Sequence, residues 1–145
     1  MKRWILYSLL VASTFFAPVR RVDVGTLQPV EIICISKEEE IITIRTDTGD
    51  FGQGETIGQA VKDLQDTAMG IVYFDTAEFL LLDRGVQTEV AQLLEQLHAS
   101  VRVCLVQGEP DLTSVKKYLR AHGYIPQIKQ WMQGERLPVL LCENS

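Results

Sequence analysis

The sequence has few cysteines, and their spacing excludes a structural zinc site. Cys34, Cys104 and Cys142 form no CxxC pair and no Cys/His ligand set, so we expect no metal site. Cys34 and Cys104 each lie inside an apolar run, where a cysteine usually behaves as a small buried hydrophobe. If the domain is exported, a disulfide to Cys142 could also form.

Positive charge is also scarce. The 145 residues contain 14 Lys and Arg against 19 Asp and Glu, a net charge of -5, and no basic run follows Arg21. A nucleic-acid-binding surface would need clustered Lys and Arg, so we expect no nucleic-acid partner. The length suits one domain with a single core.

The common catalytic signatures are absent as well. There is no GxSxG elbow and no GK[ST] phosphate-binding loop, and Cys104 has no base beside it in the sequence. His98 and His122 fall in the last turns of predicted helices, where an imidazolium interacts favourably with the helix dipole. We therefore predict that the chain is not an enzyme and binds no cofactor.

The N-terminal residues have the pattern of an export segment. Lys2 and Arg3 precede an apolar run from Trp4 to Val19. As a helix this run would reach about 24 Å, against about 30 Å for a bilayer core, so a cleaved signal peptide and an uncleaved signal anchor both fit. We expect residues 1–21 to be this segment, with the rest of the chain on the extracytoplasmic side of the cell membrane, or secreted after cleavage.

The remaining chain reads as a linker over residues 22–29 and one α/β (α+β) domain over residues 30–145. Two β-rich runs around "KEEE" predict a hairpin of Val30–Ser36 and Ile41–Thr46. Thr56 is a natural N-cap for a helix that ends before Gly70. The other expected elements are strands at Ile71–Phe74 and Glu78–Leu82, a helix over 87–99, a strand over 101–107, a helix from Asp111 to Gly123, and a pair of short strands around "QGER". The order ββαβαβαββ, with about three helices, predicts one mixed sheet.

The stretch "TDTGDFGQGETIGQAVKDLQ" contains DTG, the motif around an aspartic protease nucleophile. Arg45 would keep Asp47 ionised, and Asp50 would add charge that a proton-sharing aspartate pair does not tolerate. Those proteases are also built almost wholly of strands, whereas helices follow here. We interpret DTG as a polar turn with Gly49 at positive φ.

Glycines in the same stretch precede a helix, as in phosphate-binding turns. The spacing of Gly52, Gly54 and Gly58 is GxGxxxG, which matches neither dinucleotide nor P-loop motifs. The carboxylates of Asp47, Asp50 and Glu55 would repel a phosphate at the helix N-terminus. A flexible turn from hairpin to helix is the better interpretation.

The stretch "GQGETIGQAVKDLQDTAMGIVYFDTAEFLLLDRGV" resembles the first domain of the Ger(x)C family, lipoprotein C subunits of spore germinant receptors. The resemblance covers roughly residues 30–120, with "VRVCLVQGEPDLTSVKKYL" matching the next strand and helix. The residues that carry it are Gly52, Gly54, Thr56, Ala60, Leu64, Gln65, Leu80 to Leu82 and Gly85. It implies a non-catalytic membrane-surface protein that assembles with partner subunits of a spore or envelope complex.

We therefore expect a non-catalytic, membrane-associated scaffold or receptor-subunit-like domain that acts through protein–protein assembly. Two alternatives remain: an exported hydrolase using the acidic loop of Asp47, Asp50 and Glu55, and a small-molecule or peptide-binding module with a groove beside the Gly52–Gly58 turn. The candidate contact residues are Phe51, Gly52, Gly54, Trp131 and Met132, because exposed aromatic and methionine side chains are favoured at interfaces.

Overall fold

A computed structural model describes residues 27–142 of the chain. The predicted export segment and most of the predicted linker lie outside this range. Leu27–Pro29, expected to end the linker, instead forms strand β1, which pairs in parallel with β5 (Ile71–Tyr73) in a separate two-stranded sheet. The ordered domain therefore begins before residue 30.

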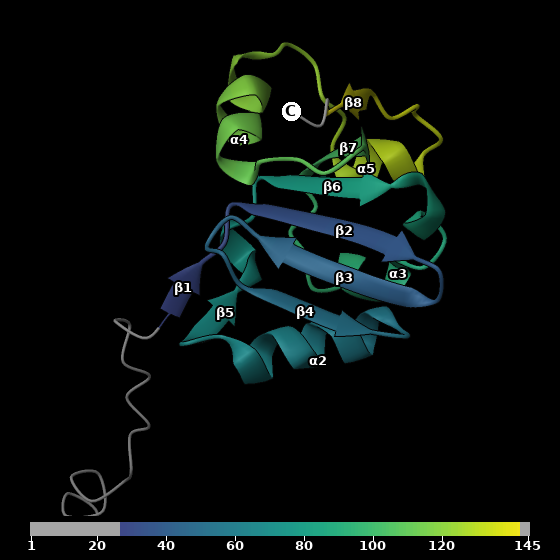
Figure 1. The fold of residues 1–145 in the computed structure, drawn as a ribbon. Coiled ribbons are helices and arrows are strands. Elements are labelled where there is room, and N and C mark those ends of the chain that lie inside the picture. Colours follow the sequence, from purple (N-terminus) through teal and green to yellow (C-terminus); the bar gives the residue numbers. More distant parts are fainter. Residues whose placement is uncertain (1–26, 143–145) are drawn as a thin grey trace, which may run out of the picture.

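The central sheet has six strands in the order β4-β3-β2-β6-β7-β8 (Figure 1). Their bounds, in that order, are Phe51–Gly54, Ile41–Thr46, Ile32–Glu38, Phe79–Asp83, Arg102–Gln107 and Val139–Leu141. Strands β2, β6, β7 and β8 run parallel, whereas β3 is antiparallel to both of its neighbours. The predicted α/β (α+β) class is confirmed, and the central sheet is mixed, but the strands form two sheets where one was expected, because β5 pairs with β1 instead of joining the central sheet.

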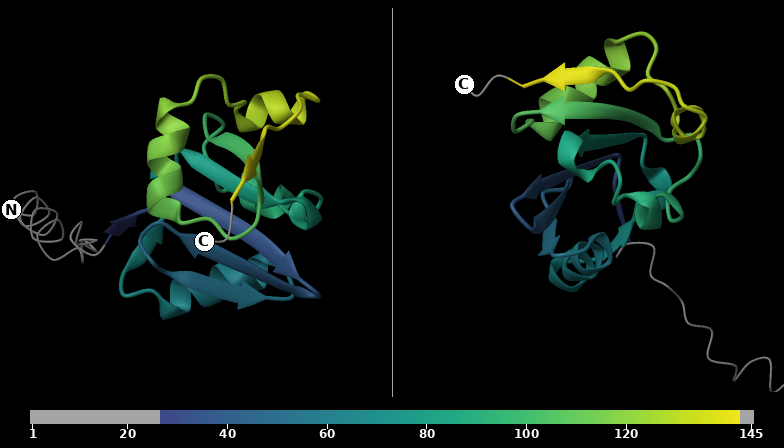
Figure 2. Two further views of the ribbon diagram at one scale, coloured as in Figure 1. Left: turned by 45° about the horizontal axis from the view of Figure 1, so that its top comes forward. Right: turned by 90° about the vertical axis from the view of Figure 1, so that its right-hand side faces the viewer.

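Helices cover the two faces of this sheet unequally (Figure 2). They are α2 (Ile57–Thr67), α3 (Ala91–Leu94), α4 (Leu112–Ala121) and α5 (Ile128–Met132), with 3-10 turns η2 (Phe74–Thr76) and η3 (Arg84–Val86). Residues of α2, α3 and α5 share one buried cluster with Ile33 and Ile35 of β2. Ile32 and Cys34, which point to the opposite face, pack with Val115 and Leu119 of α4. Because successive side chains of β2 point to opposite faces of the sheet, this strand contributes to a core on each face.

The strongest sequence patterns predicted their elements well. The hairpin of β2 and β3 is confirmed, as are the helix that Thr56 caps, where the Thr56 hydroxyl accepts from the Gln59 N–H, and the helix that Asp111 caps. None of the helices in residues 27–142 is long and apolar enough to cross a membrane.

Three local predictions were wrong. Phe51–Gly54, expected to be loop, forms β4, because its alternate residues pack against α2 and pair with β3. The helix expected over 87–99 is only α3, flanked by turns. The first strand expected in the tail is α5, whose start is fixed by a capping box of Gln127 and Gln130.

Candidate binding groove

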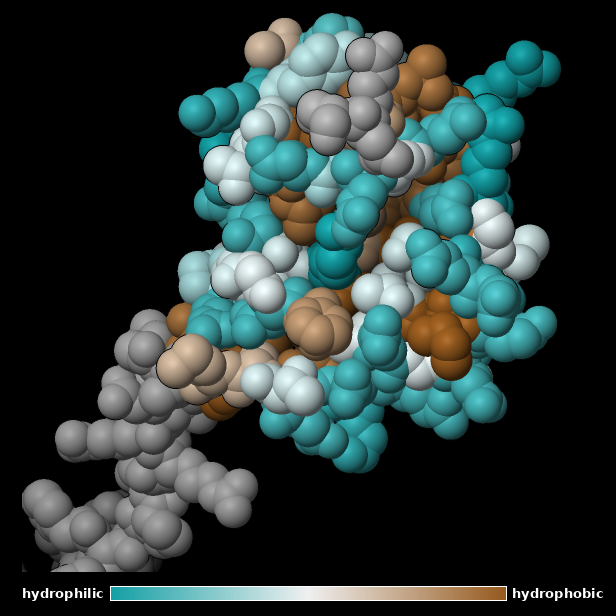
Figure 3. All heavy atoms as spheres, viewed as in Figure 1, coloured by the Kyte–Doolittle hydropathy of each residue, from teal (hydrophilic) through white to brown (hydrophobic). Residues whose placement is uncertain are grey.

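One half of a sheet face is left open, and a groove lies along it. On the α4 side of the sheet, α4 reaches as far as β2, and the outer strands β3 and β4 turn partly exposed residues such as Arg45 and Phe51 to the solvent. Figure 3 shows this face: hydrophilic residues cover most of it, with apolar residues between them.

The larger hollow of the groove, about 790 Å³, lies between the β3–β4 turn and the start of α4. We call it the α4 groove. Its lining residues are Arg45, Thr46, Asp47, Gly49, Asp50, Phe51, Glu109, Pro110, Asp111, Leu112, Thr113 and Cys142. Four carboxylates and a single guanidinium therefore face it, which makes the groove acidic.

A second hollow of about 440 Å³ continues the groove toward the carboxyl ends of β6 and β7. Both hollows are lined by Arg45 and Glu109, whose ion pair (Nη1 to Oε1, 2.9 Å) crosses between β3 and the β7–α4 loop. The segment that follows β6 packs on the face of the sheet that α3 covers. The segment that follows the neighbouring strand β7 packs on the opposite face, under α4. In open α/β sheets such a divergence at the carboxyl ends of parallel strands is where ligands bind.

The β3–β4 turn forms one wall of the α4 groove. The Thr46 N–H donates to the Asp50 carbonyl (3.0 Å), and the Gly49 N–H donates to the Thr46 carbonyl (3.1 Å). Gly49 has φ +91°, as predicted for the DTG turn. The Thr48 hydroxyl donates to Asp50 Oδ2 (2.8 Å), so local bonds fix the shape of this wall.

Asp47, the residue of the protease-like motif, holds this turn against the sheet. Its Oδ1 accepts from the backbone N–H groups of Glu31 (3.1 Å) and Ile32 (3.3 Å), at the start of β2. Burial raises the pKa of the Asp47 carboxyl, although the backbone donors act in the opposite direction. Asp47 therefore adds side-chain hydrogen bonds to the backbone bond from its own N–H to the Ile32 carbonyl (3.3 Å), at the end of the β2–β3 pairing.

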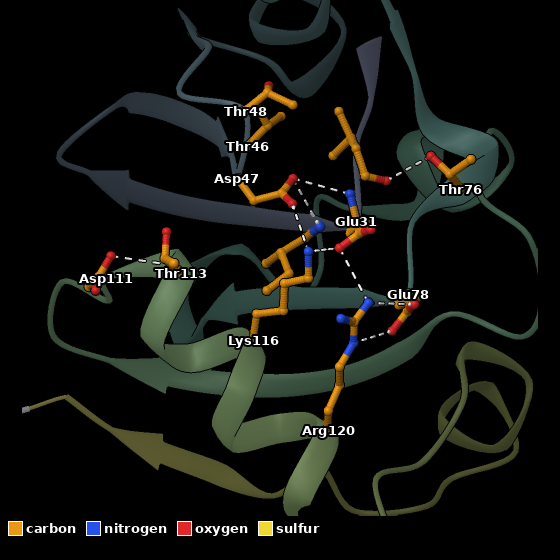
Figure 4. A network of polar contacts seen from close by, with 12 residues as sticks. Glu31, Thr46, Asp47, Thr48, Thr76, Glu78, Asp111, Thr113, Lys116 and Arg120 are labelled. Carbon is orange, nitrogen blue, oxygen red and sulfur yellow. Dashed lines mark hydrogen bonds and ion pairs between the residues drawn. The ribbon is translucent and has the colours of Figure 1, made fainter.

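A charged cluster lies next to Asp47 at the amino ends of β2 and β6 (Figure 4). Lys116 of α4 pairs with Glu31 and lies 3.7 Å from Asp47 Oδ2. One turn further along α4, Arg120 contacts Glu31 (3.3 Å) and Glu78 (2.8 Å). These pairs fix α4 over the sheet, and with it the second wall of the groove.

The start of α4 is fixed by Asp111. Its Oδ1 accepts from the Thr113 N–H (3.3 Å), and its Oδ2 accepts from the Ser114 hydroxyl (2.5 Å). These bonds lower the pKa of the Asp111 carboxyl. Asp111 and Asp47 are thus both groove-lining residues and parts of the groove's frame.

The glycines of the predicted turn serve helix packing. A Cβ on Gly52 would lie 2.2 Å from the Ala60 carbonyl oxygen, and one on Gly54 would lie 2.6 Å from Cβ of Gln59. Glycine lets α2 lie directly on β4. Among the residues of β4, Phe51 alone lines the α4 groove.

The five candidate contact residues are not brought together. Phe51 lines the α4 groove with 57% of its surface exposed. Gly52 and Gly54 lie under α2. Trp131 is partly buried against the core of the other face, and Met132, 72% exposed, borders a separate hollow beside α5.

The acidic loop does not form one site either. Asp50 and Glu55 flank β4 at its two ends, about 16 Å apart for an extended chain, and only Asp47 and Asp50 line the α4 groove. His98 and His122 contact Ser100 and Tyr118 and do not line the groove.

The cysteines are free thiols in the described structure, without the disulfide that export would allow. Burial raises the pKa of Cys34 to about 11 and that of Cys104 to about 12, so both are inert at neutral pH. No cluster of metal-ligating side chains occurs among residues 27–142.

The sequence reasoning missed the second wall, residues 109–113. The signal was present: "QGEPD" follows a buried strand directly and opens a helix, which is the position of ligand-binding loops in α/β sheets.

Comparison with known protein families, curated proteins and solved structures gives no match to this chain.

Proposed function

We propose that this chain is a non-catalytic, membrane-associated domain that acts through protein–protein assembly, and that the α4 groove receives a segment of its partner. The observation that supports the proposal is that the carboxylates lining the groove already form bonds that hold the groove in shape. Asp47 accepts backbone N–H groups, Asp111 caps α4, and Glu109 pairs with Arg45. Residues held in this way present a fixed shape and charge to a ligand.

The charge and exposure of the groove favour a partner segment with basic side chains. Four carboxylates and one guanidinium line it, so an approaching Lys or Arg meets net negative charge. Phe51 offers an exposed ring at the wall, and cations bind over such rings with about 0.5–1 kcal/mol at exposed sites. Phe51 is therefore the contact residue that we retain from the sequence analysis.

The membrane setting is proposed from the sequence alone. The apolar run Trp4–Val19 is the basis for export or anchoring. The resemblance to the Ger(x)C domain is the basis for placing the partner in a spore or envelope complex. Both stay predictions.

A hydrolase is the second candidate, because burial raises the pKa of Asp47 in the wall of the α4 groove. Its nucleophile or base would be Asp47, with Asp50 on the same wall. Hydrolysis of a peptide or ester library that is abolished by Asp47→Asn, with the fold intact, would favour this candidate over assembly.

The test of assembly uses a photo-crosslinking amino acid in the full-length protein in membranes of the source cells. Placed at Asp50, beside Phe51, it should capture a protein that is lost when Phe51→Ala is added. The matched control is Met69→Ala, which also removes an exposed apolar side chain (97% exposed) but at the end of α2. Equal capture by the Phe51→Ala and Met69→Ala variants would contradict the proposal.

A further inference from the structure

The two edge strands of the central sheet, β4 and β8, differ in whether other parts of the chain bond to their outward backbone groups. At β4, side chains of α2 occupy the outward backbone groups. The Gln53 N–H donates to Asp63 Oδ2 (2.8 Å), and the Thr67 hydroxyl donates to the Phe51 carbonyl (3.3 Å). Such bonding closes an edge to further strands.

The edge at β8 has no such cover among the described residues. On its inner side the Leu105 N–H donates to the Pro138 carbonyl (2.9 Å), and the Cys142 N–H donates to the Gln107 carbonyl (2.9 Å). Because backbone groups alternate along a strand, Val139 and Leu141 turn their N–H and C=O groups outward. Within residues 27–142, no strand pairs with this side of β8.

The hollow beside this edge is lined by side chains that carry no charge, and the edge itself exposes apolar residues. Val139 is 40% exposed and Leu141 70% exposed. A shallow hollow of about 470 Å³ lies between β8 and α4, lined by Ser114, Val115, Tyr118, Val139, Leu140, Leu141 and Cys142. None of these side chains is charged at neutral pH, in a chain of net charge -5.

We propose that β8 pairs with β8 of a second copy of this chain, in antiparallel orientation about a two-fold axis at Leu140. In this register Val139 lies opposite Leu141 of the second copy, and Leu141 opposite Val139. Both residues carry outward backbone groups, so each pair exchanges both of its hydrogen bonds. The two six-stranded sheets then become continuous, and the hollows beside α4 meet across the axis.

The partner of this edge is a second copy of the chain because β8 can pair with an identical β8. The outward groups lie symmetrically about Leu140, which is the requirement of an isologous interface. A basic partner would gain nothing here, since no carboxylate lines this hollow. Two chains of like net charge can approach at a neutral edge, and added salt should strengthen their association by screening the repulsion.

The test is the oligomeric state of the full-length protein in detergent micelles, by sedimentation at rising protein concentration. The wild type is expected to form a dimer that strengthens with salt. Leu141→Pro removes an N–H that β7 does not use and should weaken dimerisation by about tenfold or more, since Pro is tolerated on an edge strand of the monomer. Leu141→Lys, which keeps the N–H, should weaken it through charge.

Met69→Lys is the matched control, because it places the same charge at an exposed apolar position far from β8 in the sequence. It should leave the dimer unchanged, and the thermal melting of all three variants should show a folded domain. A wild type that stays monomeric, or a dimer that survives both changes at Leu141, would overturn the proposal. Crosslinking in the α4 groove does not depend on this result, so the two proposals can fail separately.

Discussion

Asp47 connects the β3–β4 turn to the start of β2 through two backbone hydrogen bonds. In the sequence it was part of a protease-like motif, and the neighbouring Arg45 and Asp50, together with the predicted helices that follow, argued against that role. No local pattern indicated its partners, because Glu31 and Ile32 lie sixteen and fifteen positions away. The positive φ of Gly49, by contrast, could be predicted, since it depends on the turn itself.

The Asp47→Ala variant should lower the free energy of unfolding by about 1–3 kcal/mol, because two partly buried N–H groups lose their acceptor. Asp47→Asn keeps a side-chain oxygen and should lose less. Chemical denaturation of both variants in the same detergent measures the difference. Equal losses for Ala and Asn would show that charge, and not acceptance of the N–H groups, is what Asp47 contributes.

The raised pKa of Asp47 predicts how its contribution varies with pH. The folded state binds this proton more tightly than the unfolded chain does, so the resulting stabilisation is present below the unfolded-state pKa, about 3.9. It is lost as pH rises through the higher folded-state value. The unfolding free energy of wild type minus that of Asp47→Asn should therefore fall as pH rises from the unfolded-state pKa through the raised folded-state pKa. A difference that grows with pH would mean that pairing with Lys116 outweighs burial.

At the scale of elements, the two helices that have both a side-chain N-cap and an apolar stripe were predicted correctly, whereas the helix expected over 87–99 proved much shorter and β4 was missed. The helix after Thr56 has both an N-cap and an apolar stripe, so its sequence suffices. The strand β4 contains two glycines and no apolar alternation, and it forms because α2 packs on it. The glycines that resembled a phosphate loop are the contact surface for that helix.

Gly52→Ala should therefore destabilise the domain strongly, by more than about 2 kcal/mol, since its Cβ would meet backbone atoms of Ala60 and Leu64 at 2.2 and 2.3 Å. Backbone of a packed helix cannot move aside as a flexible side chain can. Gly85→Ala is the control, because its Cβ would have nothing within 4 Å. Thermal melting compares the two, and a Gly52→Ala variant as stable as Gly85→Ala would refute this view of the α2–β4 contact.

At the scale of the molecule, the fold class followed from the order of elements, but the site did not. The groove combines the β3–β4 turn with the β7–α4 loop, segments about sixty residues apart that meet only once the strand order is known. The sequence located Phe51 on one wall and had no means of pairing it with residues 109–113. Trp131 and Met132 were chosen by residue type, and α5 carries them to the other face.

The central claim is that the α4 groove binds a basic polypeptide segment, and a residue-resolved NMR titration of the full-length protein in micelles tests it most directly. The probe is an extended peptide in which lysine alternates with valine, and the control is one in which glutamate alternates with valine. We predict that the lysine peptide shifts the amide signals of residues 45–51 and 109–113, that Phe51→Ala reduces its affinity, and that salt weakens binding. Shifts spread over the whole acidic surface, or equal shifts with the glutamate peptide, would contradict the claim.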